Sequence, residues 1–302
     1  MLYNDSILSD FSFREGHKSF PLFPELELIT NFMPELPEVE TTVRMIGPLL
    51  QGRTIIGVWN DWPKHIAVPI ISELRKRIKH RKIESISRRG KYLVISLDID
   101  EYLLIHLKMT GHLSISDESE PIGPYVHTAF DLDNGQQLQF RDVRKFGRVY
   151  LVNNPEEILG NLGPEPLSID FTGDLFRSML LGRNRMLKPL LLDQTFLAGL
   201  GNIYTDEALH DAAIHPGRIA TSLSRNESIT LHNSITTILT TAVEKNGASV
   251  DSYRKPDGAP GEMQNSLKVY GQAGSACSRC GSVIERMILG GRGTHYCPSC
   301  QK

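Results

Sequence analysis

Four cysteines near the end of the 302-residue chain constrain its fold more than any other feature. They form two Cys-x2-Cys pairs separated by sixteen residues, at Cys277, Cys280, Cys297 and Cys300. Two residues between cysteines let a tight turn aim both thiolates at one tetrahedral Zn²⁺ ion. Zinc binding supplies about 10–16 kcal/mol of folding energy, which suits a segment too short for a core of its own. We therefore predict one structural zinc, with no coordination position left for a catalytic water.

The cysteines also admit two other uses. Disulfides are one, but they are rare in cytosolic proteins, and residues 1–32 lack the basic start and apolar core of a secretory signal. A redox-active Cys-x2-Cys is the other, although the two pairs account for every cysteine in the chain. No apolar run approaches the ~20 residues that cross a bilayer. The expected compartment is the cytoplasm, with no membrane association.

The hydrophobic pattern divides the chain into segments. Residues 1–32 show no periodicity, and we interpret them as a disordered extension or the result of a wrongly chosen start codon. Residues 33–164 begin with a helical pattern that ends near Gly52 and continue with short β-type runs, which together predict a β-sandwich with flanking helices. The predicted strands are Thr54–Trp59, Ile83–Ser87, Tyr92–Leu97, Tyr102–Leu107, Thr128–Leu132, Gln137–Phe140 and Arg148–Val152. Residues 165–264 are predicted to be helical, and residues 265–302 to form the zinc hairpin. The fold class is therefore multi-domain α+β.

Individual turn and cap signals refine this scheme. Asp133-Asn134-Gly135 between two apolar runs predicts a tight hairpin. Asn226 or Ser228 is the predicted N-cap of a long C-terminal helix, which Gly247 would end. Residues 248–266 are rich in Pro and Gly in a polar background, and are predicted to form a mobile loop.

The charge balance does not show a basic footprint. The formal net charge is −2, and leaving out residues 1–32, which hold five acids and two bases, changes it only to +1. A nucleic-acid surface would have to come from clusters of basic residues, such as those within residues 75–82 and 88–91. The alternative for each cluster is a solvated helix face. Arg292, beside the glycines of the predicted hairpin tip, suits a phosphate contact or is a solvated turn residue.

A second segment carries chemistry: Met33-Pro34-Glu35-Leu36-Pro37-Glu38-Val39-Glu40. Removal of Met33 would leave Pro34 with a free secondary amine. An α-amine has a pKa of about 7.7–8.0, against about 10.4 for lysine, so it is nucleophilic far more often at neutral pH. Such an amine can attack a sugar C1′, displace a base and leave an iminium ion, with Glu35 moving protons during ring opening. The alternative is that the prolines only stiffen a helix entry.

From Met33 to Lys302 the chain resembles the formamidopyrimidine-DNA glycosylase family, bacterial repair enzymes for 8-oxoguanine and ring-opened purines. The opening Pro34-Glu35-Leu36-Pro37-Glu38 is similar to that family rather than to its endonuclease VIII relatives, in which glycine usually stands at the position of Leu36. The resemblance implies an N-terminal β-sandwich, a C-terminal helix–two-turn–helix bundle with a zinc finger, and double-stranded DNA in the cleft between them.

The resemblance also implies roles for individual residues. Pro34 matches the family's nucleophile and Glu35 the acid that assists it. Lys91, in Arg88-Arg89-Gly90-Lys91, matches a lysine that contacts phosphate near the lesion.

Three further residues match those that enter the DNA where a nucleotide is flipped out. Met109, in His106-Leu107-Lys108-Met109-Thr110-Gly111, resembles the residue that fills the gap. Arg144, in Asp142-Val143-Arg144-Lys145-Phe146-Gly147, would pair with the orphaned cytosine, and Phe146 would wedge into the stack. Extruding a nucleotide costs a few kcal/mol, so the chemistry requires such fillers.

In the C-terminal half, Asn202 of Leu200-Gly201-Asn202-Ile203-Tyr204 matches a phosphate-binding asparagine. Lys188 matches a lysine near the lesion, and Glu207 an acid close to the catalytic amine. Arg292 matches the zinc-finger arginine that grips phosphates, and Ser249–Gln264 resembles a lesion-capping loop.

The implied activity is that of a monomeric DNA glycosylase with AP lyase activity in base excision repair, acting through β,δ-elimination. Three alternatives remain open: a relative specialised for oxidised pyrimidines, a non-enzymatic binder of damaged DNA, and a zinc-ribbon transcription factor, which would leave residues 34–147 unexplained. One feature departs from the family pattern. A chain that begins at Met1 holds the Pro34 nitrogen in a peptide bond, and an amide nitrogen is no nucleophile.

Overall fold

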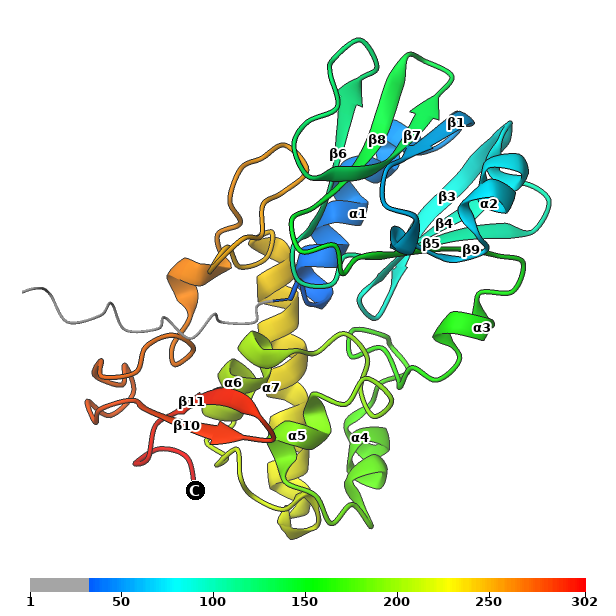
Figure 1. Cartoon of the computed structure of the whole chain (residues 1–302). Helices are drawn as coiled ribbons and strands as arrows, with labels where there is room; N and C mark the ends of the chain where they lie inside the picture. Colours follow the sequence, from blue (N-terminus) through cyan, green and yellow to red (C-terminus); the bar gives the residue numbers. More distant parts are fainter. Residues whose placement is uncertain (1–32) are drawn as a thin grey trace, which may run out of the picture. The chain divides into compact units, whose positions relative to one another are not determined.

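The computed structural model describes residues 33–302 (Figure 1). Residues 1–32, for which the sequence predicts a disordered extension or a wrongly chosen start, lie outside the described residues. The described part is α+β, as predicted. Strands fill its N-terminal half, helices follow, and a two-stranded hairpin comes last.

The N-terminal half is built on nine strands in one continuous sheet. They are β1 (Thr54–Asn60), β2 (Ile66–Val68), β3 (Arg81–Arg89), β4 (Tyr92–Leu97), β5 (Glu101–His106), β6 (Gly111–Asp117), β7 (Val126–Leu132), β8 (Gln136–Asp142) and β9 (Arg148–Val152). The order across the sheet is β2-β9-β5-β4-β3-β1-β7-β8-β6. The β1–β3 pairing has only two matched residue pairs, Thr54 with Lys82 and Ile55 with Arg81. The sheet can therefore fold over at this point.

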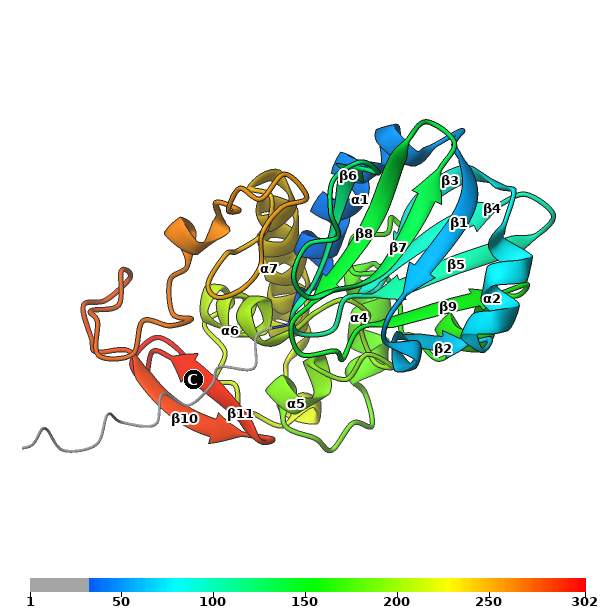
Figure 2. The same cartoon turned by 45° about the horizontal axis from the view of Figure 1, so that its top comes forward.

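The two parts of the sheet pack face to face beside α1 (Leu36–Leu50), as Figure 2 shows. One hydrophobic core joins them, with Leu103 from one part, Phe130 from the other and Ile46 from α1, all fully buried. The alternation of apolar and polar residues along each strand supplies this inner face. The predicted β-sandwich is confirmed.

Several local predictions hold, and three elements are new. The β7–β8 hairpin turns at Asp133-Asn134-Gly135, where Gly135 has a φ of +77°, and Gly52 follows α1 with a φ of +83°.

The strands β2 and β6 and the helix α2 (Ile71–Ile78) are not among the predicted elements. The basic run at 75–82 begins on α2, whose buried side is only Leu74 and Ile78. The solvated-helix interpretation therefore fits the first half of that run.

The C-terminal half holds five helices, which are α3 (Glu156–Leu159), α4 (Gly173–Leu180), α5 (Leu187–Leu191), α6 (Asn202–Asp211) and α7 (Arg225–Glu244). Three 3₁₀ turns complete the described helical segments: η1 (Pro63–His65), η2 (Ala220–Ser222) and η3 (Met263–Ser266). A second hydrophobic core lies among these helices and includes Leu36 of α1. Val39, one turn further along α1, belongs to the core of the sandwich. The helix α1 therefore packs into both halves.

The prediction that Asn226 or Ser228 caps the long helix is wrong. Ser224 is the N-cap of α7: its hydroxyl accepts from Glu227 N–H at 3.2 Å, and Glu227 accepts from Ser224 N–H at 2.8 Å. A Ser with Glu three residues later forms this reciprocal capping box, which satisfies two helix donors at once. Gly247 follows the helix with a φ of +77°, as predicted.

The chain ends in the hairpin of β10 (Glu285–Leu289) and β11 (Arg292–Tyr296), with Gly290 and Gly291 at its tip. Within residues 33–302, no helix is long and apolar enough to cross a membrane.

Candidate active site

Pro34 and Glu35 lie immediately before α1, where the two halves of the described unit meet. Both residues are buried, and Glu35 is only 2 % exposed. Glu35 N–H donates to Glu38 Oε2 at 2.8 Å, and Leu36 N–H donates to Gly199 O of the C-terminal half at 2.9 Å. The backbone around the predicted nucleophile is thus held on both sides.

The Glu35 side chain lies at the N-terminus of α6. Its Oε1 accepts from Ile203 N–H at 2.8 Å and its Oε2 from Tyr204 N–H at 3.4 Å. The first turn of a helix presents such unpaired N–H groups together with a positive dipole end, which favours a carboxylate. Gly201 is required for this approach, because an added Cβ would lie 2.3 Å from Glu35 Cδ.

A second buried carboxylate, Glu38, lies beside the first. It is fully buried and accepts from the Tyr204 hydroxyl at 2.5 Å and from Ala248 N–H at 2.8 Å. Glu38 is not among the site residues predicted from the sequence. The sequence feature that could have revealed it is the Glu35-x-x-Glu38 spacing. This spacing is typical of a helix capping box, which here fixes the position of Glu35.

Burial dominates the electrostatics of Glu35. Removal from water raises the pKa of Glu35 to about 7, with the charge of Lys91 opposing this rise and that of Glu38 adding to it. Lys91 is 8 % exposed. Burial lowers the pKa of the Lys91 ammonium, and the nearby Glu35 opposes that shift. A carboxyl group with such a pKa can both give and accept a proton near neutral pH.

Glu165 positions the turn that carries Lys91. Its carboxylate accepts from Arg88 Nη1 at 2.7 Å, Arg89 Nη1 at 3.0 Å and Gly90 N–H at 2.5 Å. Arg88 also pairs with Glu40 at 3.0 Å, so both arginines of the 88–91 cluster form ion pairs within the protein. Lys91 is the member of the cluster next to Glu35.

Lys188 is fully buried rather than exposed. Its ammonium donates to Asp206 Oδ1 at 2.6 Å and to Gly293 O at 2.9 Å. Lys188 thus joins α5, α6 and the hairpin tip. Burial lowers its pKa, and Asp206 is the main opposing charge. Its predicted contact with DNA stays a prediction.

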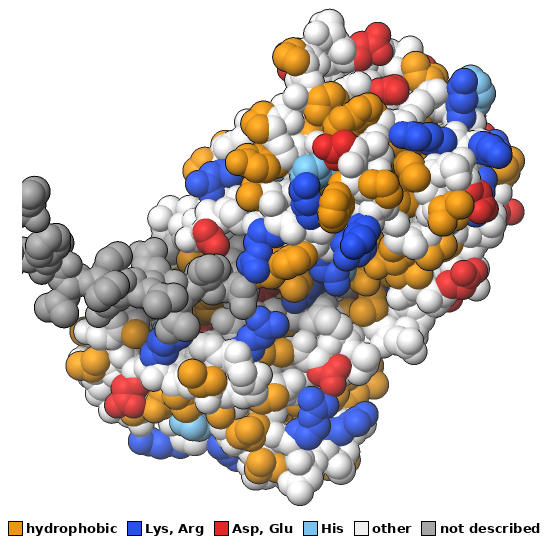
Figure 3. All heavy atoms as spheres, viewed as in Figure 1, with side chains coloured by type: hydrophobic (Ala, Val, Ile, Leu, Met, Phe, Trp, Pro, Cys, Tyr) orange, Lys and Arg blue, Asp and Glu red, His pale blue; other side chains and the backbone are white. Residues whose placement is uncertain are grey.

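Arg292 is exposed at the start of β11. Its positive charge contributes to lowering the pKa of both Lys91 and Lys188, so the three cations lie close together. Figure 3 shows Lys and Arg side chains gathered across the middle of one face, where Asp and Glu are few. A chain of nearly balanced charge therefore still presents a local basic surface.

Asn202 and Glu207 both lie on α6. Asn202 is the first residue of the helix, and its buried Oδ1 has no hydrogen-bond partner among the described residues. Glu207 is 1 % exposed and accepts three backbone N–H bonds, from Lys268 at 2.8 Å and from Val269 and Tyr270 at 2.9 Å. Glu207 therefore anchors the segment that leads to the cysteines. Its predicted support of the catalytic amine stays a prediction.

The three predicted DNA-inserting residues lie on two neighbouring turns. Met109 is half-buried between β5 and β6, whereas Arg144 and Phe146 are exposed on the β8–β9 turn. The Arg144 guanidinium lies over the Phe146 ring at 4.9 Å, and 45 % of Phe146 is exposed. Arg144 N–H also donates to the Thr110 hydroxyl at 3.0 Å, so the two turns are connected.

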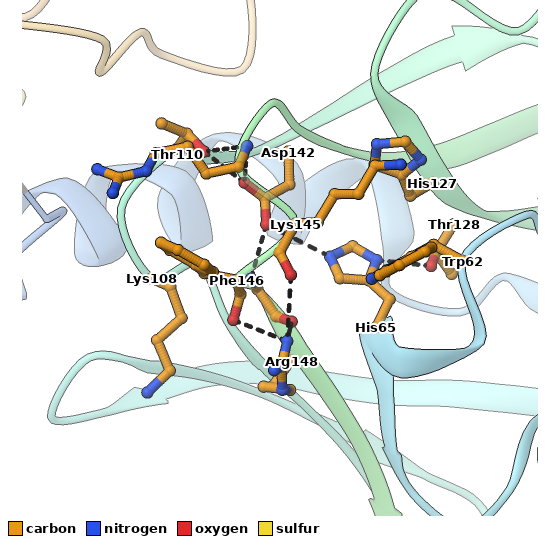
Figure 4. A network of polar contacts seen from close by, with 12 residues as sticks. Trp62, His65, Lys108, Thr110, His127, Thr128, Asp142, Lys145, Phe146 and Arg148 are labelled. Carbon is orange, nitrogen blue, oxygen red and sulfur yellow. Dashed lines mark hydrogen bonds and ion pairs between the residues drawn. The ribbon is translucent and has the colours of Figure 1, made fainter.

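Asp142 is the centre of the network that shapes the β8–β9 turn (Figure 4). Its carboxylate accepts from the Thr110 hydroxyl and, at 2.6 Å, from Gly147 N–H. Buried His65 places Nε2 3.8 Å from Asp142 Oδ2, and Arg148 donates to the carbonyls of 145–147. Sequence reasoning missed this network because its members lie far apart along the chain.

The predicted lesion-capping loop contacts the sandwich. Ser252 hydroxyl donates to Met109 O at 3.5 Å, and Lys255 O lies 3.0 Å from His112 Nε2. The loop between α7 and η3 thus lies against the turn that carries Met109.

The four cysteines converge as predicted. Their sulfur atoms lie within 4.8 Å of one another, with Cys277 and Cys300 at 3.9 Å and Cys280 and Cys297 at 3.5 Å. A tetrahedral zinc with Zn–S bonds of about 2.3 Å requires S···S separations of about 3.8 Å. The geometry fits one zinc with four thiolate ligands.

Comparisons with known proteins cover the same residues. The family model "Formamidopyrimidine-DNA glycosylase N-terminal domain" matches residues 33–149. "Formamidopyrimidine-DNA glycosylase H2TH domain" matches residues 162–254, and "Zinc finger found in FPG and IleRS" matches residues 274–302. The chain belongs to the formamidopyrimidine-DNA glycosylase family.

Curated relatives named formamidopyrimidine-DNA glycosylase support this membership. The protein from Protochlamydia amoebophila is 43 % identical over 89 % of this chain and 100 % of its own length, and that from Herpetosiphon aurantiacus is 45 % identical with the same coverage. Among solved structures, the complex between the Lactococcus lactis enzyme and DNA with an abasic site has 39 % identity and a TM-score of 0.83, and it covers 89 % of this chain and 99 % of the other. The wild-type enzyme with N7-benzyl-Fapy-dG DNA has the same identity and TM-score and covers 89 % and 100 %.

The contact between Gly201 and Glu35 gives the first test of this site. We expect Gly201→Ala to lower the free energy of unfolding by about 1–3 kcal/mol, because a methyl group is forced against a buried carboxyl. Urea denaturation of the purified chain measures the change.

Gly47→Ala is the matched control. The added Cβ would meet only Ile86 Cβ, at 4.0 Å, and alanine is a better helix former than the glycine that it replaces. This control should be neutral or stabilising. Equal stability of the Gly201→Ala variant and the unaltered chain would contradict the close approach.

Proposed function

We propose that this protein is a bifunctional DNA glycosylase and AP lyase of base excision repair that removes oxidised purines, including 8-oxoguanine and formamidopyrimidines, from double-stranded DNA. The observation that carries the proposal is Pro34 beside Glu35, a carboxyl that lies at the N-terminus of α6 and whose pKa burial raises to about 7. Membership of the family supports it, as do solved relatives bound to DNA with Fapy-dG or an abasic site. We place this activity in the cytoplasm, where bacterial DNA lies.

The active form should begin at Pro34. Nucleophilic attack requires a lone pair, and the Pro34 nitrogen has none available while it forms a peptide bond with Met33. The match to the N-terminal family model begins at residue 33. We therefore infer that the working enzyme carries Pro34 as its first residue.

The chemistry then follows from two groups. The Pro34 amine attacks C1′ of the damaged nucleotide and the C1′–N bond breaks. The base leaves with the bonding electrons, and it takes up the proton that the Pro34 nitrogen loses once it is bonded to C1′. Protonated Glu35 donates to the sugar ring oxygen as the ring opens, which leaves an iminium ion between Pro34 and C1′. The iminium ion acidifies the C2′ proton, so the 3′ and then the 5′ phosphate are eliminated. Water releases Pro34, and a one-nucleotide gap remains.

Other residues would hold the DNA in place. Lys91 lies next to Glu35, Asn202 begins the helix that holds Glu35, and Arg292 lies near Lys91. These three side chains suit contacts with phosphates near the lesion. Lys188 would act by fixing the hairpin tip beside Arg292, because its own ammonium is used within the protein.

The two exposed turns suit entry into the DNA. Met109, Arg144 and Phe146 would fill the space that the flipped nucleotide leaves, with Arg144 facing the orphaned cytosine. A relative that acts on oxidised pyrimidines would share this plan. A panel of oxidised purines and pyrimidines, each in a defined base pair, distinguishes the two specificities.

The role of Pro34 as the nucleophile can be tested by trapping the intermediate. Borohydride should trap a covalent adduct between an 8-oxoguanine:cytosine duplex and a form that begins at Pro34, and peptide mass mapping should locate it at Pro34. The 302-residue chain serves as the matched control and should give no adduct, because its Pro34 nitrogen is an amide.

Lesion binding without an adduct in the Pro34 form would contradict the enzyme and leave a damage-binding protein. An adduct at a lysine would reject Pro34 as the nucleophile.

The insertion of the Phe146 ring into the DNA can be tested by removing the ring. Phe146→Ala in the Pro34 form should slow excision of 8-oxoguanine opposite cytosine by roughly 5- to 150-fold, because stacking on an aromatic ring is worth about 1–3 kcal/mol. Cleavage at a preformed abasic site should change much less, since no base has to be extruded. Single-turnover assays on both substrates measure the difference.

Val143→Ala is the control, because it removes another exposed apolar side chain from the same turn. An equal loss on both substrates, or an equal effect of Val143→Ala, would contradict the wedge.

A further inference from the structure

One side of α6 is attached at successive turns to the zinc module. Asp206 accepts from His295 N–H of β11 at 2.9 Å. Glu207 accepts from the three backbone N–H groups of residues 268–270. His210 follows one turn later and is also buried, with 3 % of its surface exposed. The helix that holds Glu35 at its first turn therefore reaches the cysteines at its last.

His210 contacts a zinc ligand directly. Its Nε2 lies 3.5 Å from Cys277 Sγ, and both residues are buried. Cys277 Sγ also accepts a hydrogen bond from Arg279 N–H at 3.4 Å. In the second cysteine pair, Cys297 Sγ likewise accepts from a backbone N–H, that of Cys300, at 3.4 Å. His210 therefore brings a side chain from α6, outside the zinc module, to a cysteine sulfur.

The chemistry of the site gives this contact a purpose. Four thiolates around Zn²⁺ leave a net charge of two minus, and a buried negative charge is costly unless donors surround it. An imidazole N–H supplies such a donor and also restricts where the sulfur can lie. Groups that hydrogen-bond to metal ligands orient those ligands, and losing one typically lowers metal affinity by about 10–100-fold.

We propose that His210 is a positioning residue of the zinc site. Its Nε2–H donates to the Cys277 thiolate, raises the affinity of the four-cysteine site for zinc, and attaches the metal to the last turn of the helix whose first turn holds Glu35. His210 is not itself a ligand, because the four sulfurs complete the tetrahedron.

The test measures zinc affinity in the full 302-residue chain by competition with a chromophoric chelator. His210→Phe removes the donor and keeps an aromatic ring, and it should weaken zinc binding about 10–100-fold. His210→Gln keeps an N–H near the position of Nε2 and should stay within a few-fold of the unaltered chain. If the phenylalanine variant does not fold, the smaller His210→Leu takes its place.

His232→Phe is the matched control. His232 lies on α7, and its Nε2 lies 2.7 Å from Phe171 O. This contact involves no residue of the zinc module. Loss of this hydrogen bond should leave zinc affinity unchanged. Unchanged affinity in His210→Phe, or an equal loss in His232→Phe, would overturn the proposal.

Cobalt substitution gives a second readout that a purely structural role would not move. A hydrogen bond stabilises the thiolate lone pair, so its loss should shift the thiolate-to-cobalt charge-transfer band to lower energy in His210→Phe but not in His210→Gln. Identical bands in all the variants would overturn the proposal even if the affinities differ.

Discussion

The contact on which the site depends is a carboxylate at the start of a helix. Glu35 belongs to the N-terminal half, and the N–H groups of Ile203 and Tyr204 that hold it belong to the C-terminal half. Gly201 leaves the space in which they meet. Burial where the halves meet raises the pKa of Glu35, whereas these two N–H groups oppose that rise. The packing of the two halves therefore sets both the position and the pKa of the proposed acid.

Both ends of α6 take part in this arrangement. Its first turn holds Glu35, its middle pairs Asp206 with buried Lys188, and its last turn places His210 against Cys277. Arg292, at the hairpin tip next to Gly293, is fixed by the same set of bonds. The zinc module is thus attached through one ten-residue helix to the residue that we propose as the acid, although four thiolate ligands leave the metal no position for a catalytic water.

Sequence alone predicted the features whose signals are local. The cysteine spacing, the Asp133-Asn134-Gly135 turn and most of the strands follow from short patterns, and the strand bounds of β4 and β9 agree to the residue. The cap at Ser224 was missed because three polar residues competed for the position. The long-range contacts of Glu38, Asp142 and Lys188 could not be predicted, because Ala248, Thr110 and Asp206 lie 210, 32 and 18 residues from them and only packing brings them together. The family resemblance gave residues their expected roles, but not the contacts that hold them.

The most direct test of this account is the pKa of the Glu35 carboxyl in the 302-residue chain. Carbon-detected NMR can follow the side-chain carboxyl resonances through a pH titration, and the resonance absent from Glu35→Gln identifies this residue. The account predicts a midpoint near 7. A midpoint near 4.5, the ordinary value for a glutamate, would show that burial does not raise this pKa and would contradict Glu35 as a proton donor near neutral pH.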